Sequence, residues 1–249
     1  MKKKKYVWLW ILAPIGICLF YLWYAHASIY WKLGAVGLGA PSDMHNYTIG
    51  NASGVPLTYV ALGDSLTSGV GVDSYTQSYP YLLAEKIAAA SNTQVTLMPF
   101  AVPGVRTDYV LSNFIIPALA SKPDIITLFI GINDIHGKVS NALFKAHYSE
   151  ILSQLSQGSH AHIYVINLPY IGTPELISPL YRYYFAWRTQ QYNAIIKDLA
   201  DQYHVTYIDL YAAHKPHELN AMYYASDYFH QNALGYTLWT QSIYAGFNQ

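Results

Sequence analysis

The sequence predicts an α/β protein, a three-layer α/β/α sandwich around a five-stranded parallel sheet with a transmembrane helix in front of it. Short apolar runs alternate with longer helical patterns from residue 57 onward, which is typical of a parallel sheet covered by helices. The length of 249 residues suits one such domain with a short extension. An uninterrupted apolar run near the N-terminus predicts the transmembrane helix.

That apolar run, residues 6–25, contains no Asp, Glu, Lys or Arg. A helix of about 20 apolar residues matches a hydrocarbon core of roughly 30 Å, so the run is long enough to cross a membrane. Lys2 to Lys5 precede it directly, and the positive-inside bias predicts that they stay in the cytoplasm. We therefore expect attachment to the cell membrane through residues 6–25, with the rest of the chain outside the cytoplasm.

A cleaved signal peptide is the alternative interpretation of residues 1–30. Ala25-His26-Ala27 has the small-x-small form of a cleavage site, and cleavage near Ala27 would release a secreted protein. The apolar run is longer than the roughly 7–15 residues of an ordinary signal peptide, which favours a retained signal anchor. Both interpretations export the body of the protein, and both remain open at this point.

Residues 31–55 are predicted to be a linker. The stretch 34–54 is rich in Gly, Ser, Pro and Asn and has no strong periodicity, which indicates a tether. We see no internal repeat and no second domain, so residues 56–249 are expected to form a single domain.

The expected elements of that domain alternate along the chain. The predicted strands are 57–62, 95–98, 125–130, 163–167 and 205–208. The predicted helices are 78–90, 107–119, 142–155, 181–202 and 232–244. Reactive groups in such sheets collect at the carboxyl ends of the strands, so the search for a site begins there.

Composition excludes several classes of function. Of 14 Lys/Arg residues four are Lys2 to Lys5, and 14 minus 4 leaves 10 basic against 14 acidic residues, so no basic surface for nucleic acid is expected. Cys18 is the only cysteine, which excludes an internal disulfide. The pairs His160/His162 and His214/His217 lack partner ligands at zinc spacing, so we predict no metal and no cofactor. Oligomeric state is not predictable from these features.

A serine follows the first predicted strand, in Gly63-Asp64-Ser65-Leu66. A serine hydroxyl is a poor nucleophile at neutral pH, so it needs a base within hydrogen-bond reach and a third group that orients the base. Asp227 and His230 lie three residues apart just before the last predicted helix. That spacing lets the Asp227 carboxylate fix the tautomer of His230 while the other ring nitrogen faces Ser65.

Two further residues are candidates for an oxyanion hole. Asn133 follows the third strand in Gly131-Ile132-Asn133-Asp134, and its amide could donate to the negative charge that develops during acyl transfer. Gly104 follows the second strand, where a residue without Cβ lets a backbone N–H approach a substrate.

These four blocks resemble, in order and spacing, those of the GDSL (SGNH) hydrolases. The resemblance covers residues 58–243, and Asn232, Gly235 and Tyr236 match it in addition to the candidate catalytic residues. Two departures are Pro99, where the family often has Asn, and Gln231, where Pro is frequent. A proline at position 99 could alter the conformation of the loop that carries Gly104.

The resemblance implies a flavodoxin-like fold and a serine esterase that acts on carboxylic esters of lipids, lysophospholipids or acetylated glycans. It implies a catalytic triad of Ser65, Asp227 and His230. It also implies an oxyanion hole formed by the N–H groups of Ser65 and Gly104 and the side chain of Asn133. Two alternatives remain open, an O-acyltransferase on the same fold and a non-catalytic protein that binds the cell envelope.

Several other side chains have more than one interpretation. The aromatic stretch 181–187 could form an acyl-binding or sugar-binding wall, or could simply pack on the sheet as one face of a helix. His136 could line the pocket or lie in a solvated loop. Arg106 could hold an anionic group of a substrate or pair with Asp108.

Overall fold

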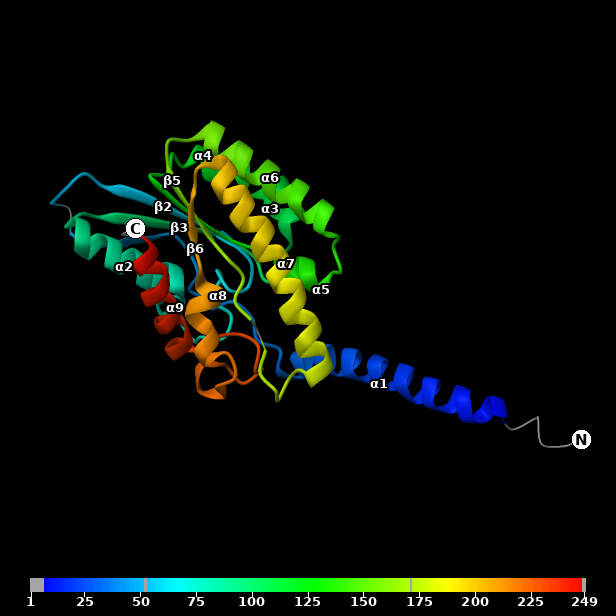
Figure 1. The fold of residues 1–249 in the computed structure, drawn as a ribbon. Coiled ribbons are helices and arrows are strands. Elements are labelled where there is room, and N and C mark those ends of the chain that lie inside the picture. The colour runs from blue at the N-terminus through cyan, green and yellow to red at the C-terminus, as the bar shows by residue number, and fades with distance from the viewer. Residues whose placement is uncertain (1–6, 52, 171, 248–249) are drawn as a thin grey trace, which may run out of the picture.

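One mixed sheet with helices on both faces forms the body of the protein. The computed structural model describes residues 7–51, 53–170 and 172–247, and Figure 1 shows the sheet edge between two groups of helices. The strands are β1 (Tyr47–Ile49), β2 (Leu57–Gly63), β3 (Val95–Ala101), β4 (Ile125–Phe129), β5 (His162–Ile166) and β6 (Thr206–Ile208). Their order across the sheet is β1-β3-β2-β4-β5-β6.

The five predicted strands pair in parallel in the order β3-β2-β4-β5-β6. All five residues of β4 are buried, as expected for a strand covered on both faces. Gly63 at the end of β2 aligns with Ala101 of β3 and Phe129 of β4. The loops that leave these three strands therefore start side by side at one edge of the sheet.

The prediction of five strands is wrong by one. A sixth strand, β1, runs antiparallel to β3, with Tyr47 opposite Leu97 and Ile49 opposite Val95. It falls within residues 31–55, which were predicted to be a linker. The strand is only three residues long and lies in a Gly/Ser/Asn-rich stretch, so its sequence shows no strand periodicity. It is recognised as a strand only by its pairing with β3.

Two layers of helices cover the sheet (Figure 1). On one side α2 (Tyr79–Ser91) contacts α9 (Ala233–Gly246), and α9 contacts α8 (Leu210–His214). On the other side α6 (Asn141–Gly158) contacts α3 (Thr107–Asn113), α4 (Ile115–Ala120) and α7 (Pro179–Tyr203). The remaining short elements are α5 (Ile132–His136) and the 3-10 turns Tyr75–Gln77, Lys215–His217 and Ala221–Tyr223.

The single helix predicted at 107–119 is divided into α3 and α4, with the break at Phe114. Pro117 explains it, because a proline ring clashes with the carbonyl four residues earlier, here that of Asn113, and cannot donate to it. The other predicted helices differ from the observed ones by a few residues at their ends.

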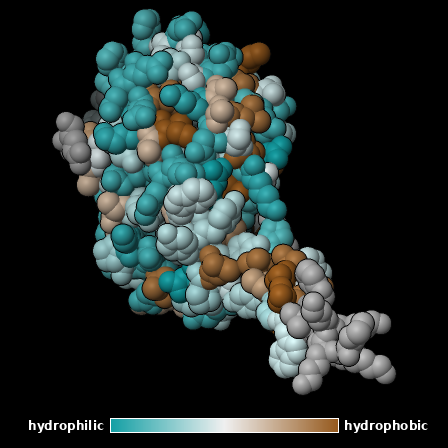
Figure 2. All heavy atoms as spheres, turned by 45° about the vertical axis from the view of Figure 1, so that its right-hand side comes forward, coloured by the Kyte–Doolittle hydropathy of each residue, from teal (hydrophilic) through white to brown (hydrophobic). Residues whose placement is uncertain are grey.

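The N-terminal helix α1 (Val7–Val36) projects from the body (Figure 1). Among the described residues, one helix is long and apolar enough by length and composition to cross a membrane, over Trp10–Val36. Figure 2 shows hydrophobic side chains gathered along this projection, whereas the face of the body in that view is mainly hydrophilic. Lys2 to Lys5 and Tyr6 lie outside the described residues.

The second half of α1 belongs to the folded body. Ala25 and Ile29 are buried, and Ile29 joins the hydrophobic core. The Lys32 ammonium donates to the carbonyl of Glu175 at 2.7 Å. The small-x-small triplet that ends at Ala27 therefore lies inside a helix that is packed against the domain.

Candidate active site

Ser65 lies in a tight turn directly after β2 and is almost fully buried. The carbonyl of Asp64 accepts from the N–H groups of Thr67 and Ser68, and the carbonyl of Ser65 accepts from the N–H of Val70. These bonds fix the backbone on both sides of the serine. The Ser65 side chain is thus presented at the carboxyl edge of the sheet by a rigid turn.

His230 and Asp227 come from the loop before α9. The Nε2 atom of His230 lies 2.9 Å from the Ser65 hydroxyl oxygen, and Nδ1 lies 2.5 Å from an Asp227 carboxylate oxygen. A carboxylate accepts only, so Nδ1 carries the proton and the neutral ring presents the Nε2 lone pair to Ser65. The structure therefore brings the three predicted residues into one hydrogen-bonded chain.

The loop around His230 is held in place by the Asp227 carboxylate and by the start of α9. The second carboxylate oxygen of Asp227 accepts from the N–H groups of Phe229 and His230, at 2.9 and 3.0 Å. The side chain of Asn232 caps α9 by accepting from the N–H of Gly235 at 3.1 Å. His230 thus follows a closed turn and precedes a capped helix, which restricts the direction of its ring.

Electrostatics keep Asp227 ionised. Burial alone raises the pKa of its carboxyl, but the hydrogen bond and charge of His230 and the two N–H donors outweigh burial, so the pKa is lowered below its ordinary value. A carboxylate at this position stabilises the imidazolium that forms when His230 accepts a proton.

Asn133 lies in α5, directly after β4 and Gly131. Its amide nitrogen donates to a carboxylate oxygen of Asp64 at 3.1 Å and to the carbonyl of Val105 at 3.0 Å. The reverse orientation of the amide would place its oxygen against two acceptors, so these partners also define which way the side chain points. Both amide hydrogens are engaged in this arrangement.

Asp64 is a residue of the site that the sequence interpretation did not assign. Burial raises the pKa of its carboxyl to about 7, against the smaller opposing effects of the Leu66 N–H and the Asn133 amide. The sequence does contain a sign of this residue, because an acidic side chain at the end of a buried apolar strand, next to Ser65, is unusual. The Asp64 carboxylate accepts from the Asn133 amide and so helps to orient it.

Gly104 lies in the loop between β3 and α3, with φ at +83°. Nothing lies within 4 Å of where its Cβ would be, so conformation rather than space favours glycine here. Gly104 and Asn133 line one open cleft of about 680 Å³, here called the polar cleft. Its other walls include Arg106, Asp108 and Asn113.

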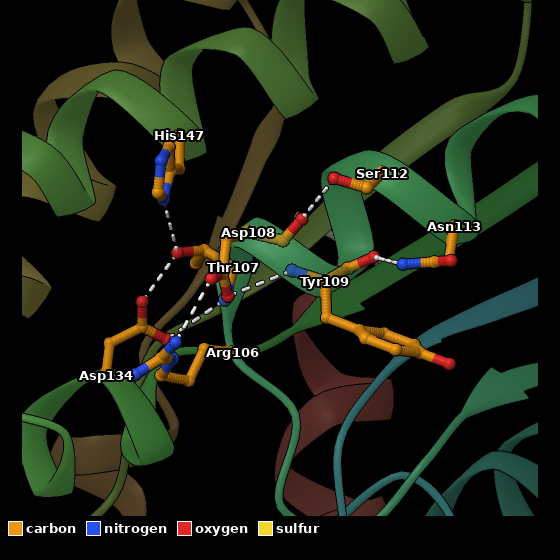
Figure 3. A network of polar contacts seen from close by, with 8 residues as sticks. All are labelled: Arg106, Thr107, Asp108, Tyr109, Ser112, Asn113, Asp134 and His147. Atoms are coloured by element: carbon orange, nitrogen blue, oxygen red, sulfur yellow. Dashed lines mark hydrogen bonds and ion pairs between the residues drawn. The ribbon is translucent and has the colours of Figure 1, made fainter.

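A hydrogen-bond network fastens the loop that carries Gly104 to α5. The buried Asp134 carboxylate accepts from the N–H and hydroxyl of Thr107 at 3.1 and 2.5 Å, and His147 lies 3.3 Å from the same hydroxyl. Figure 3 shows Asp134 and His147 converging on Thr107 from two helices. Arg106 pairs with Asp108 at 3.1 Å, and both side chains line the polar cleft.

His136 lies between the polar cleft and a second, apolar groove. The apolar groove, of about 400 Å³, is lined by side chains of α1, α5 and α7, among them Leu22, Ile135, Leu180, Tyr184, Phe185 and Trp187. Within residues 181–187, Phe185 is buried, as expected for a face that packs on the sheet, whereas Tyr183 is exposed. Both side chains line the apolar groove.

His214 is buried and has a structural role. Its ring accepts from the indole N–H of Trp239 at 3.0 Å and lies 3.2 Å from the Tyr224 hydroxyl. Among the residues that the structure describes, no group of three or more His, Cys, Asp or Glu side chains is arranged to hold a metal ion.

Comparisons with known proteins agree with this architecture. The profile of the GDSL-like Lipase/Acylhydrolase family matches residues 61–238. The spore germination lipase of Bacillus licheniformis is 26% identical over 208 residues, which cover 76% of this chain and 95% of that protein.

Two solved structures illustrate the likeness of the fold. A lipase from a goat rumen metagenome has a TM-score of 0.64 at 23% identity, and the match covers 76% of this chain and 97% of the other. An acetylxylan esterase from Geobacillus stearothermophilus has a TM-score of 0.63 at 17% identity, with 80% and 96% covered.

Proposed function

Because the chain belongs to the GDSL-like lipase/acylhydrolase family, whose members are carboxylic ester hydrolases, we propose that it hydrolyses esters through a Ser65-His230-Asp227 triad. The observation that supports this most directly is the continuous hydrogen-bonded chain from the Asp227 carboxylate through the imidazole to the Ser65 hydroxyl. Ser65 is the nucleophile, His230 the general base, and Asp227 the group that orients and stabilises the imidazole.

The proposed reaction has two steps. In the first, His230 Nε2 takes the proton of Ser65 as Oγ attacks the ester carbonyl; the bond to the alcohol oxygen then breaks, and His230 returns the proton to the departing alcohol. In the second, His230 takes a proton from water as the water oxygen attacks the acyl-serine. The bond to Oγ breaks, the acid leaves, and Ser65 recovers its proton.

We assign the oxyanion hole to the N–H groups of Ser65 and Gly104 and the amide of Asn133. The Asn133 amide is held by Asp64, the residue before Ser65, and it shares the polar cleft with Gly104. Since both amide hydrogens are engaged, stabilisation of the oxyanion requires that Asn133 exchange one of its two bonds, to Asp64 or to the Val105 carbonyl. Loss of one oxyanion-hole donor typically costs about 2.7–4 kcal/mol of transition-state stabilisation.

We further propose that α1 is a signal anchor that holds the catalytic body outside the cytoplasm. The apolar surface of its first half and the burial of Ala25 and Ile29 in its second half support a helix that leaves a membrane directly into the domain. Secretion after cleavage near Ala27 is the alternative, and the size of the mature protein in membrane and culture fractions distinguishes the two.

The test of the esterase proposal is hydrolysis of p-nitrophenyl acetate by the full chain and by Ser65→Ala. The variant should lose at least about a thousandfold in kcat, since the nucleophile is absent. Ser91→Ala, in which the lost hydroxyl donates only to the Ile87 carbonyl within α2, is the matched control. Retained activity in Ser65→Ala would remove this serine from the mechanism.

A further inference from the structure

The apolar groove is built partly from the N-terminal helix. Leu22 and His26 of α1 form one wall, and the first turns of α7 form the opposite wall. The ring of His26 stacks on that of Tyr181 with centroids 5.7 Å apart, and the Tyr181 hydroxyl donates to the carbonyl of Leu22 at 3.5 Å. In Figure 1 the start of α7 lies against the inner half of α1. The groove therefore exists only where these two helices meet.

A short run of rings connects the groove to the proposed triad. The ring of Phe229 lies 4.9 Å from that of His230 and 5.5 Å from that of His136, measured between centroids. His136 in turn contacts Phe185 at 4.8 Å and lines both the apolar groove and the polar cleft. If the ester carbonyl lies at the Asn133 amide, the rest of the substrate can therefore reach the apolar groove by passing the side chain of His136.

The two cavities differ in chemistry. The polar cleft presents the charged side chains of Arg106 and Asp108, which suit an alcohol or head group. The apolar groove presents almost entirely hydrocarbon and aromatic surface. Burial lowers the pKa of His136 to about 4, so the side chain between the cavities is uncharged at neutral pH. The exposed Lys138 is the charged side chain on the lining of the groove.

The open side of the groove continues the apolar surface of α1. Leu180, Tyr183 and Trp187 of α7 are exposed beside it, at 50%, 75% and 49% of their surface. On α1 a run of exposed apolar residues extends from Trp10 to Tyr24 and ends where Ala25 is buried; Trp31 is exposed again further along the helix. A bilayer that surrounds the first half of α1 would therefore reach the mouth of the groove.

We propose that this groove binds the hydrocarbon chain of a long-chain acyl ester taken from the membrane, with the anchor helix as one wall of the binding site. Its volume of about 400 Å³ lies within the range of about 300–1,000 Å³ usual for ligand pockets. The proposal rests on the esterase function proposed above and narrows its substrate class from esters in general to membrane lipids.

The test uses the full chain in phosphatidylcholine vesicles and compares hydrolysis of p-nitrophenyl palmitate with that of p-nitrophenyl butyrate. In Leu180→Glu a carboxylate faces the groove, which disfavours a hydrocarbon occupant. The ratio of kcat/KM for palmitate to that for butyrate should fall at least about fivefold relative to the native chain. Leu143→Glu is the matched control, because Leu143 is 48% exposed in the first turn of α6, outside the groove.

A second pair of variants tests the contribution of α1. Leu22→Trp enlarges a side chain of the groove wall and should lower the same ratio, whereas Leu19→Trp enlarges an exposed neighbour on the same helix and should leave it unchanged. Equal ratios in Leu180→Glu and Leu143→Glu, or in the two tryptophan variants, would overturn the lipid-groove proposal. Failure of the native chain to hydrolyse either ester would instead overturn the esterase function.

Discussion

The Nε2 atom of His230 lies 2.9 Å from the hydroxyl of Ser65, although 165 positions separate the two residues in the chain. The docking of α9 maintains this approach: the Tyr236 hydroxyl donates to the carbonyl of Val70 at 3.0 Å, which ties α9 to the turn that carries Ser65. Gly71 lies so close to the carbonyl of Gln231 that a Cβ there would come within 2.2 Å. The two halves of the site are held together by direct contact between their loops.

Asp227→Asn should lower kcat for p-nitrophenyl acetate by about 10⁴, because an amide no longer fixes the tautomer that presents Nε2 to Ser65. The measurement is steady-state kinetics at neutral pH, with circular dichroism to check the fold. Asp201→Asn is the control, since Asp201 is exposed and pairs only with Lys197 at the surface of α7. Loss of less than tenfold would exclude Asp227 from the triad.

Asn133→Ala should lower kcat by about 10²–10³ and change KM little, because an oxyanion donor acts in the transition state and not in the bound ester. Asn46→Ala, at an exposed asparagine, provides the comparison. An increase in KM with kcat preserved would show that the Asn133 amide binds substrate and does not stabilise the oxyanion.

Gly104→Ala should lower kcat/KM by about tenfold. The backbone at Gly104 has φ of +83°, and an L-residue in that region costs about 1–2 kcal/mol, so alanine displaces the loop from its place beside Asn133. Gly39→Ala adds the same methyl where φ is ordinary and no atom lies within 4 Å. If both variants behaved alike, the position of the Gly104 loop would not matter for catalysis.

Asp64 makes the stability of the protein depend on pH. Its folded pKa of about 7 exceeds the ordinary value of 3.8, so in this range the folded state binds more protons than the unfolded state. The contribution of Asp64 to stability is therefore largest below about pH 4 and declines as the pH rises to about 7. Asp64→Asn, which cannot ionise, should show a smaller decline in Tm across that interval, measured by thermal unfolding in detergent micelles. An unchanged slope would contradict the raised pKa.

The α/β fold follows from the sequence because its central strands are buried on both faces. Such strands are short apolar runs, and β2 and β4 begin at the residues predicted for them. The carboxyl ends of parallel strands share one edge of a sheet, so the residues that follow these runs are expected to lie near one another. Ser65 and Asn133 are candidates for this reason, from their positions along the chain alone.

The features that the sequence does not reveal depend on distances between segments. The strand β1 is defined by its pairing with β3, since Tyr47 to Ile49 carry no pattern of their own. The contact between Asp64 and Asn133 spans 69 positions and joins two loops that look unrelated in the chain. The apolar groove needs α1 and α7 to lie side by side, which amphipathicity of either helix cannot predict. The break between α3 and α4, by contrast, can be predicted from the sequence, because Pro117 cannot continue the helix through that point.

The unbroken course of α1 into the buried contacts at Ala25 and Ile29 has a geometric consequence. If the first half of α1 lies in a bilayer, as proposed above, this continuous helix holds the body next to the lipid surface. The esters within reach of the active site would then be those that lie in or close to that surface.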